Sequence, residues 1–319
     1  MHLIRKLETD YIHYIKNKTK NANLDNISRT KAYQNFYRLF PEIKWSFLAS
    51  MVSRNAGWNM TDMKTETYKE FLSPRVRKQL FSTYERANWL IFSDAYPQLL
   101  LYQLSDTINK PLFHLLEDFS VSKFMQREWC HFWREKDKDR LLTALIINEQ
   151  NVIQVPVTKH PFYKYHVFMN WPYLLQDFFK MSAVLFPSRK GYVYAIDVHD
   201  FSNVTNRINL GKRLASTLFH PMLYQHFYDF ALHTEHTGSR SDYEQYIVDD
   251  SYSTSNSPSL RRVFPIIDHQ DTFRMDWYLE RGIKKKWWKT EDISDNQWNS
   301  YNKKKKLIET FIHMKNYIM

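Results

Sequence analysis

The sequence predicts a mainly α-helical, multi-helix globular body with one small β-hairpin and a basic helical C-terminal extension. Apolar residues recur at helical spacing along most of the chain, and only residues 182–198 hold paired runs of β-branched and aromatic composition. The chain has only 5 glycines among 319 residues, which argues against a turn-rich β-sandwich. No two glycines lie close together, which also argues against the glycine-rich phosphate loops of Rossmann and P-loop proteins.

The spacing of apolar residues places the helices along the chain. It predicts helices over residues 2–20, 26–40, 41–57, 75–104, 121–153, 203–219 and 221–236, and the charged run REKDKDR within 121–153 is a candidate turn between two helices. We expect the third of these helices to end at Gly57, because glycine suits a left-handed C-cap. We expect the long fourth helix to break near Pro97, since proline removes a backbone hydrogen bond. Gly238 is expected to stop the last helix of the body.

The predicted organisation is one mainly helical domain over residues 1–248, with the hairpin at about 182–198. The two strands are SAVLF and GYVYAIDV, joined by the turn residues PSRK. Residues 249–259 have the composition of a mobile loop. Residues 260–319 are expected to form a basic, aromatic extension that packs on the body. This extension would contain a short strand in RRVFPIIDH and a last helix that starts at about residue 295.

The net charge of +11 is concentrated at the two ends of the chain. Residues 1–31 hold seven Lys or Arg and three Asp or Glu, whereas residues 281–306 hold nine and three. The rest of the chain is therefore nearly neutral. A folded nucleic-acid-binding domain more often carries its basic residues on one folded face, so the charge alone does not indicate such a domain.

The composition predicts a cytoplasmic protein without a transmembrane segment. Cys130 is the only cysteine, so it cannot form an internal disulfide, and we expect a buried, inert thiol between the bulky rings of WCHFW. The N-terminus shows no signal-peptide pattern, and no run approaches the about 20 apolar residues that cross a bilayer. The most apolar run, NWLIFSDAYPQLLLY, is interrupted by Asp94 and Pro97.

The clearest candidate for chemistry is the segment HFYDFALHTEHTGSR. At about 100° per residue, a helix places His226, Asp229, His233 and His236 within an arc of about 80°. Histidine and carboxylate at this spacing can exchange protons or bind a metal ion, for which His226, Asp229 and His233 would be the ligands. Arg240 follows closely as a further catalytic candidate. Alternatively, these histidines stabilise a helix C-terminus, and their spacing matches no zinc motif such as HExxH.

Two predicted helices carry polar residues on otherwise apolar faces. Arg54 and Asn55 lie on the apolar face of one helix, and Glu85 and Asn88 lie on that of another. An unpaired buried charge is very costly, so we expect Arg54 to pair with Glu85, with both asparagines in the same network. Such a network is either a catalytic or binding site or a structural network that sets helix packing.

The C-terminal extension contains KKKWWK and, at residues 303–306, KKKK. Lys284, Lys285, Lys286, Trp287 and Trp288 combine positive charge with indole rings, which suits phosphate contact together with base stacking. The same residues suit an anionic membrane surface. In the structural alternative, the tryptophans dock on the body and the lysines face solvent.

Four segments of the chain are distinctive: ISRTKAYQNFY, FLASMVSRNAGWNMTDM, YERANWLIFSDAYPQLLLYQL and HTGSRSDYE. They resemble segments of the YppC-like family of uncharacterised proteins from spore-forming Firmicutes. The resemblance covers most of the chain, from about residue 26 to 280. It implies a bacterial, cytoplasmic protein of unassigned role, and it brings no established activity or catalytic residues.

Three classes of function stay open. We favour a non-enzymatic cytoplasmic interaction or scaffold protein, because no catalytic signature is complete. The second class is an enzyme with a His/carboxylate/Arg site, such as a metal-assisted hydrolase. The third is a nucleic-acid or anionic membrane-surface binder that acts through the basic tail. The residues indicate neither a cofactor nor a particular substrate, protein partner or oligomeric state.

Overall fold

The structure is a computed structural model that describes residues 2–158, 160, 183–197, 203–248, 254–270, 274–278 and 282–289. The chain divides into two compact units, which are described separately below. The first unit comprises Met1–Ser53, Tyr84–His160 and Ile266–Thr290, and the second comprises Arg54–Thr83, Pro161–Pro265 and Glu291–Met319. Helices α3 (Lys44–Asp62) and α5 (Pro74–Thr107) each contribute residues to both units.

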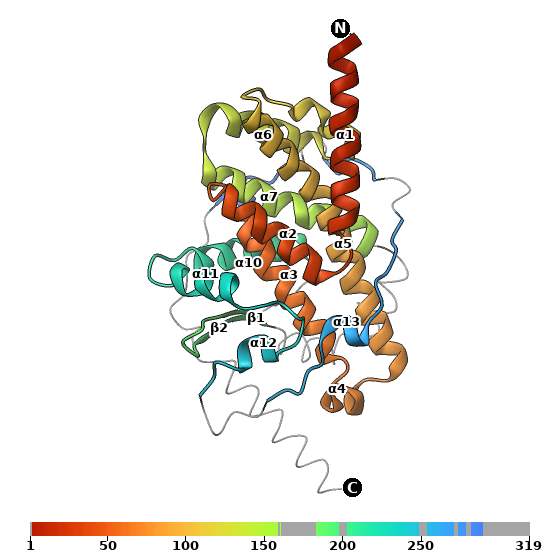
Figure 1. Ribbon diagram of the computed structural model, residues 1–319, viewed down its shortest axis with the longest axis vertical. Helices are drawn as coiled ribbons and strands as arrows, with labels where there is room; N and C mark the ends of the chain where they lie inside the picture. The colour runs from red at the N-terminus through yellow and green to blue at the C-terminus, as the bar shows by residue number, and fades with distance from the viewer. Residues whose placement is uncertain are drawn as a thin grey trace, which may run out of the picture. The chain divides into compact units, whose positions relative to one another are not determined.

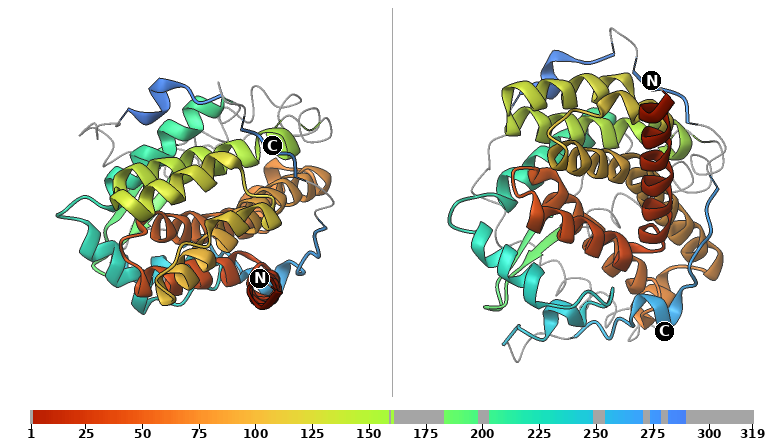
Figure 2. Two further views of the ribbon diagram at one scale, coloured as in Figure 1. Left: turned by 90° about the horizontal axis from the view of Figure 1, so that it is seen from above. Right: turned by 45° about the horizontal axis from the view of Figure 1, so that its top comes forward.

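The first unit is built from helices (Figure 1). Besides parts of α3 and α5, its elements are α1 (His2–Ala22), α2 (Asn26–Leu39), η1 (Phe113–Phe119), α6 (Lys123–Glu135), α7 (Lys138–Val152), η2 (Gln154–Thr158) and η4 (Lys285–Trp288). Helices α6 and α7 lie side by side (Figure 2), and the turn between them includes Lys136 with a φ of 55°. Tyr33, Phe92 and Tyr96 form a buried aromatic cluster with ring centres 4.6 to 6.3 Å apart.

Pro97 lies inside α5, which continues through it. The predicted break at this position is therefore wrong. The buried side chains of Tyr96 and Leu99 pack this part of the helix into the core, and this packing offsets the cost of an interior proline, about 3 kcal/mol. Because Pro97 has no N–H, it cannot donate the helical hydrogen bond to the Ser93 carbonyl.

The second unit combines helices with the hairpin. Besides parts of α3 and α5, its elements are α4 (Glu66–Phe71), β1 (Ala183–Pro187), β2 (Val193–Asp197), α10 (Val204–Leu218), α11 (Tyr224–His233), α12 (Ser241–Glu244) and α13 (Leu260–Val263). The two strands pair antiparallel, with Leu185 opposite Ala195. Phe186 of β1 packs on Phe227 of α11, with ring centres 5.4 Å apart, which attaches the hairpin to this helix.

The mainly helical fold and the predicted hairpin are confirmed, but several details are wrong. Helix α3 continues through Gly57, where an added Cβ would make a tight contact, 3.0 Å from His236 Nε2. Helix α11 ends at His233, since Thr234 adopts an extended conformation with φ −116° and ψ 117°. The strand predicted in RRVFPIIDH is not formed, because its first three residues belong to the helical turn α13 and residues 264–269 have no regular secondary structure.

Cys130 lies exposed on α6, so the predicted burial of this thiol is wrong. The buried face of the helix is formed by Phe124, Met125, Glu128, Trp129 and Phe132. In the described ranges, none of the helices is sufficiently long and apolar to cross a membrane. The helix predicted from about residue 295 lies outside the described residues, and the predicted domain boundaries near residues 248 and 260 stay predictions.

Candidate functional site

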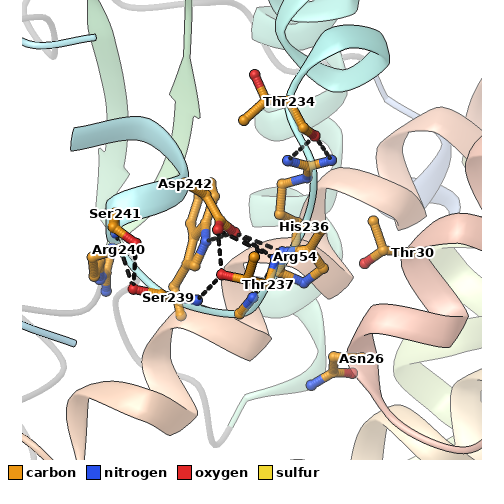
Figure 3. A network of polar contacts seen from close by, with 12 residues as sticks. Asn26, Thr30, Arg54, Thr234, His236, Thr237, Ser239, Arg240, Ser241 and Asp242 are labelled. Carbon is orange, nitrogen blue, oxygen red and sulfur yellow. Dashed lines mark hydrogen bonds and ion pairs between the residues drawn. The ribbon is translucent and has the colours of Figure 1, made fainter. Parts of the chain in front are cut away.

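The loop after α11 holds several of the predicted catalytic residues. We call residues 234–242 the His236 loop; it leads from α11 into α12. Arg54 of α3 donates from Nη1 and from Nη2 to the Thr234 carbonyl, both at 3.1 Å (Figure 3). Thr234 is the C-cap residue of α11, so Arg54 places its positive charge at the negative end of that helix. Burial lowers the pKa of Arg54 to about 10, opposed by the charge of Asp242.

His236 and Asp242 form a buried pair within this loop. His236 Nδ1 lies 3.0 Å from Asp242 Oδ2, and Trp58 Nε1 donates to the same oxygen at 3.0 Å. The backbone N–H and the hydroxyl of Thr237 also donate to Asp242 (Figure 3). Burial raises the pKa of Asp242, but these hydrogen bonds and the charge of His236 outweigh it and hold the pKa below its ordinary value. Asp242 is therefore a charged acceptor that organises the loop.

Arg240 attaches the His236 loop to the C-terminal end of α3. Its Nη2 donates to Asp62 at 2.7 Å and to Asn59 at 2.8 Å. The hydroxyl of Thr61 donates to the Gly238 carbonyl at 2.7 Å. These charged and polar groups satisfy one another, so the geometry has the character of a structural network that holds the loop.

The predicted arc of histidines on one helix face is not formed. His236 lies beyond the end of α11 and is buried, whereas His233 is exposed and His226 is half-buried. His233 Nδ1 lies 2.9 Å from Asp229 Oδ1 at the surface, where such pairs contribute little to stability. Among the residues that the structure describes, no three His, Cys, Asp or Glu side chains are placed to hold a metal ion.

The predicted pair of Arg54 with Glu85 is wrong, because both residues have other partners. In the first unit, Glu85 accepts hydrogen bonds from Arg29 of α2, at 3.0 Å from Nη1 and 2.5 Å from Nη2. His269 Nε2 lies 3.6 Å from Glu85 Oε1. Burial raises the pKa of Glu85, but the hydrogen bonds and charges of His269 and Arg29 outweigh it and hold the pKa below its ordinary value.

Asn55 binds the backbone of the hairpin in the second unit. Its Nδ2 donates to the Leu185 carbonyl at 2.8 Å, and the Leu185 N–H donates to its Oδ1 at 2.7 Å. These two hydrogen bonds satisfy the backbone N–H and C=O of Leu185 on the open edge of β1. Asn55 therefore holds the hairpin against α3. The other predicted asparagine, Asn88, lies half-buried on α5.

A second polar network lies in the first unit, with Asp94 at its middle. Asp94 Oδ2 accepts hydrogen bonds from Gln98 Nε2 at 2.7 Å and from Asn148 Nδ2 at 2.6 Å. Gln98 Oε1 in turn accepts from Trp129 Nε1 at 2.8 Å. We call the three buried residues Asp94, Gln98 and Asn148 the Asp94 centre; they come from α5 and α7.

A segment with little regular secondary structure packs on the Asp94 centre. This C-terminal segment consists of the described residues 266–270, 274–278 and 282–289. Arg274 Nη1 lies 3.5 Å from Asp94 Oδ1, and Nη2 donates to the carbonyls of Ser93 at 3.3 Å and Phe119 at 3.0 Å. The buried carboxylate of the Asp94 centre is thus neutralised by an arginine from the C-terminal segment.

The next residues of the C-terminal segment bind neighbouring helices. Asp276 Oδ2 accepts the N–H of Lys123 at the first turn of α6, at 3.0 Å. Trp277 Nε1 donates to Asn148 Oδ1 at 2.9 Å. Met275, between the anchors, is 80% exposed. Side-chain anchors that hold an irregular segment on a folded surface are typical of a bound peptide.

The tryptophans and the lysines of the KKKWWK motif lie in different environments. Trp287 is buried, and the ring centre of Trp288 lies 6.0 Å from that of Phe124. The lysines at 284–286 are exposed. The tryptophans therefore dock on the first unit, and a nucleic-acid or membrane role for the lysines stays a prediction.

Sequence reasoning missed Arg29 and the Asp94 centre, although both leave a signal. An acidic residue inside an apolar helical run, such as Asp94, indicates a buried polar group that needs partners. Arg29 lies at helical spacing from the buried Tyr33 and Phe36, and therefore on the apolar face of α2. Arg274 carries no periodic signal, because its segment is irregular.

The titration of Asp94 is shifted toward neutral pH. Burial raises the pKa of its carboxyl from 3.8 to about 6, although Arg274, Asn148 and Gln98 each act to lower it. A group whose pKa is higher in the folded state stabilises the fold below its unfolded pKa, and this contribution is lost as the pH rises through the folded pKa. For Asp94, the loss falls mainly between pH 3.8 and about 6.

We expect Asp94→Asn to remove this pH dependence. Relative to the wild-type protein, the variant should gain up to about 3 kcal/mol of unfolding free energy between pH 4 and pH 7, since each pKa unit corresponds to about 1.4 kcal/mol. Urea unfolding at several pH values measures the difference, with Asp118→Asn at an exposed carboxylate as the control. A difference that stays constant with pH would contradict the buried-charge account.

The fold, the polar network of the His236 loop and the Asp94 centre define a class of mainly helical proteins. In this class, buried polar side chains hold irregular segments in place. The chain matches the model of a family described as protein of unknown function (DUF2515) over residues 21–307. It is 50% identical to the uncharacterized protein YppC of Bacillus subtilis (strain 168) over 291 residues, 91% of this chain and 88% of that protein. The chain therefore belongs to this family of uncharacterised YppC-like proteins, which confirms the resemblance. No solved structure matches the chain.

Proposed function

We propose that this protein is a non-enzymatic cytoplasmic interaction protein whose first unit binds an irregular peptide segment. The observation that carries the proposal is the docking of the C-terminal segment. Arg274, Asp276 and Trp277 each bind a polar group of the helices, and the exposed residue between them binds none of these groups. A helical unit that holds a segment by such anchors has the features of a peptide receptor, here filled by its own chain.

The candidate catalytic residues of the second unit support the non-enzymatic proposal. His236 is engaged with Asp242, Arg240 with Asp62, and Arg54 with the end of α11. These side chains are buried and bind structural partners. A chain with one cysteine also suits the reducing cytoplasm.

A peptide with the sequence of residues 266–289 is expected to bind the full-length protein once the protein's own anchors are removed. In the double variant Arg274→Ala/Trp277→Ala, the labelled peptide should bind at least about 10-fold more tightly than to wild type, whose own segment competes at a millimolar effective concentration. Fluorescence anisotropy measures both affinities.

The control for this experiment is Arg38→Ala, which removes an exposed arginine of the first unit and should bind as weakly as wild type. Circular dichroism confirms that the double variant is folded. Equally weak binding to a folded double variant and to wild type would refute the peptide-receptor proposal.

The other two classes of function stay predictions. The predicted enzyme site comprises His226, Asp229, His233 and His236 together with Arg54 and Glu85. For a nucleic-acid or membrane-surface binder, the matching residues are the exposed lysines at 284–286.

A further inference from the structure

Three oxygen acceptors of the first unit converge on one guanidinium group. The Ser93 carbonyl is without its usual helical donor, because the residue four positions later is Pro97. The Phe119 carbonyl belongs to the last residue of η1, where carbonyls lack helical partners. The third acceptor is the Asp94 carboxylate, which is 2% exposed. Arg274 binds all three.

The chemistry of these acceptors favours a guanidinium over an ammonium group. A guanidinium carries five N–H donors in one rigid plane and can reach several acceptors at once. An ammonium is a compact, strongly hydrated charge that costs more to bury. The two carbonyls are neutral acceptors on different elements, and the carboxylate supplies the opposite charge in a buried setting. The arrangement is therefore selective for an arginine side chain.

The first unit also forms hydrogen bonds with two further residues of the bound segment, Asp276 and Trp277. Asn148, which donates to Asp94 at 2.6 Å, also accepts the indole N–H of Trp277 at 2.9 Å. Asp276 meets the positive end of α6, where backbone N–H groups favour a carboxylate. The recognised pattern is arginine, any residue, aspartate and tryptophan, with the second position in solvent as Met275 is.

We propose that the Asp94 centre, with the carbonyls of Ser93 and Phe119, is a recognition site for the arginine of a partner segment with the pattern Arg-x-Asp-Trp. In this inference, which rests on the proposed function, the protein's own residues 274–277 are an autoinhibitory occupant. A partner that carries the pattern displaces them and exposes the C-terminal segment. The site is thus both a peptide-binding site and a switch.

Chemical rescue tests the guanidinium site in the full-length chain. The variant Arg274→Ala should regain melting temperature when methylguanidinium is added, by about 2–4 °C at saturation, because a ligand that binds only the folded state stabilises it. Methylammonium at the same ionic strength should not restore it. The rescue should be lost in Arg274→Ala/Asp94→Asn and absent in Arg38→Ala. Absence of a guanidinium-selective rescue overturns the site.

Hydrogen exchange on the unaltered protein tests displacement and does not depend on the folding of any variant. An acetylated and amidated peptide Arg-Met-Asp-Trp-Tyr in excess should make the amides of residues 274–278 exchange faster. The same peptide with lysine in place of arginine should leave exchange unchanged. No acceleration with the arginine peptide overturns recognition of a partner segment.

The chemical rescue and the peptide-binding experiment on the Arg274→Ala/Trp277→Ala variant together separate this inference from the proposed function. Guanidinium-selective rescue without any binding of the peptide 266–289 to the Arg274→Ala/Trp277→Ala variant would mean that the site holds a permanent structural anchor, and both proposals fail. Peptide binding without selective rescue would keep the interaction function and reject the arginine site.

Discussion

Arg29→Met is expected to lower the free energy of unfolding by about 3–5 kcal/mol, because it leaves the Glu85 carboxylate buried without its cation. The two side chains are 1% and 5% exposed, and two hydrogen bonds join them. Urea unfolding at neutral pH measures the loss. The pKa of Glu85 is lowered from its ordinary value of 4.5, so the contribution of the pair is present above that pH and is lost as the pH falls further.

Two further variants establish the cause of this loss. The double variant Arg29→Met/Glu85→Leu removes the buried charge as well, and it should recover most of the stability, since an apolar pair of similar volume is often neutral. Arg38→Met at an exposed position should change stability by less than about 0.5 kcal/mol. If the double variant is as unstable as Arg29→Met alone, the buried unpaired charge is not the cause.

Gly238→Ala is expected to lower the free energy of unfolding by about 2–5 kcal/mol. Gly238 has a φ of 79°, where a side chain costs about 1–2 kcal/mol, and an added Cβ would lie 2.5 Å from the Leu260 Cβ. The clash adds about 1–3 kcal/mol by forcing the backbone to move. That movement would also strain the hydrogen bond from Thr61 to the Gly238 carbonyl. Thermal or urea unfolding measures the effect.

A matched substitution in the same loop is Glu235→Ala, at an exposed residue, which should cost less than about 0.5 kcal/mol. Gly238→Asn separates the two causes, because asparagine tolerates a positive φ but still carries a Cβ. It should lie between the wild-type protein and Gly238→Ala in stability. A Gly238→Ala protein as stable as wild type would show that the His236 loop is free to move away from Leu260.

The helices and the hairpin were predictable because their signals are local. Apolar spacing of three or four residues marks α1, α2 and the paired helices α6 and α7 without reference to distant residues. Gly57 and Pro97 were misplaced for the opposite reason. The approach of Gly57 to His236 and the packing of Tyr96, next to Pro97, on Tyr33 both involve residues that are remote in sequence.

The candidate site could be predicted only in part. Arg54 and Glu85 are buried and paired, as polar residues on apolar helix faces must be, but not with each other. Burial of a charge requires a partner without specifying which one. Glu85 is bound by Arg29, 56 positions earlier, and Arg54 by the Thr234 carbonyl, 180 positions later.

The sequence by itself determined the fold class, the order of most helices and the residues whose charge must be satisfied in the interior. These follow from periodicity and from the cost of burying polar groups, which are properties of short stretches of chain. Only the tertiary structure decided which partners meet and that an irregular segment covers the Asp94 centre. Long-range pairing depends on how elements pack, and an irregular segment is placed by its anchors, which carry no periodic signal of their own.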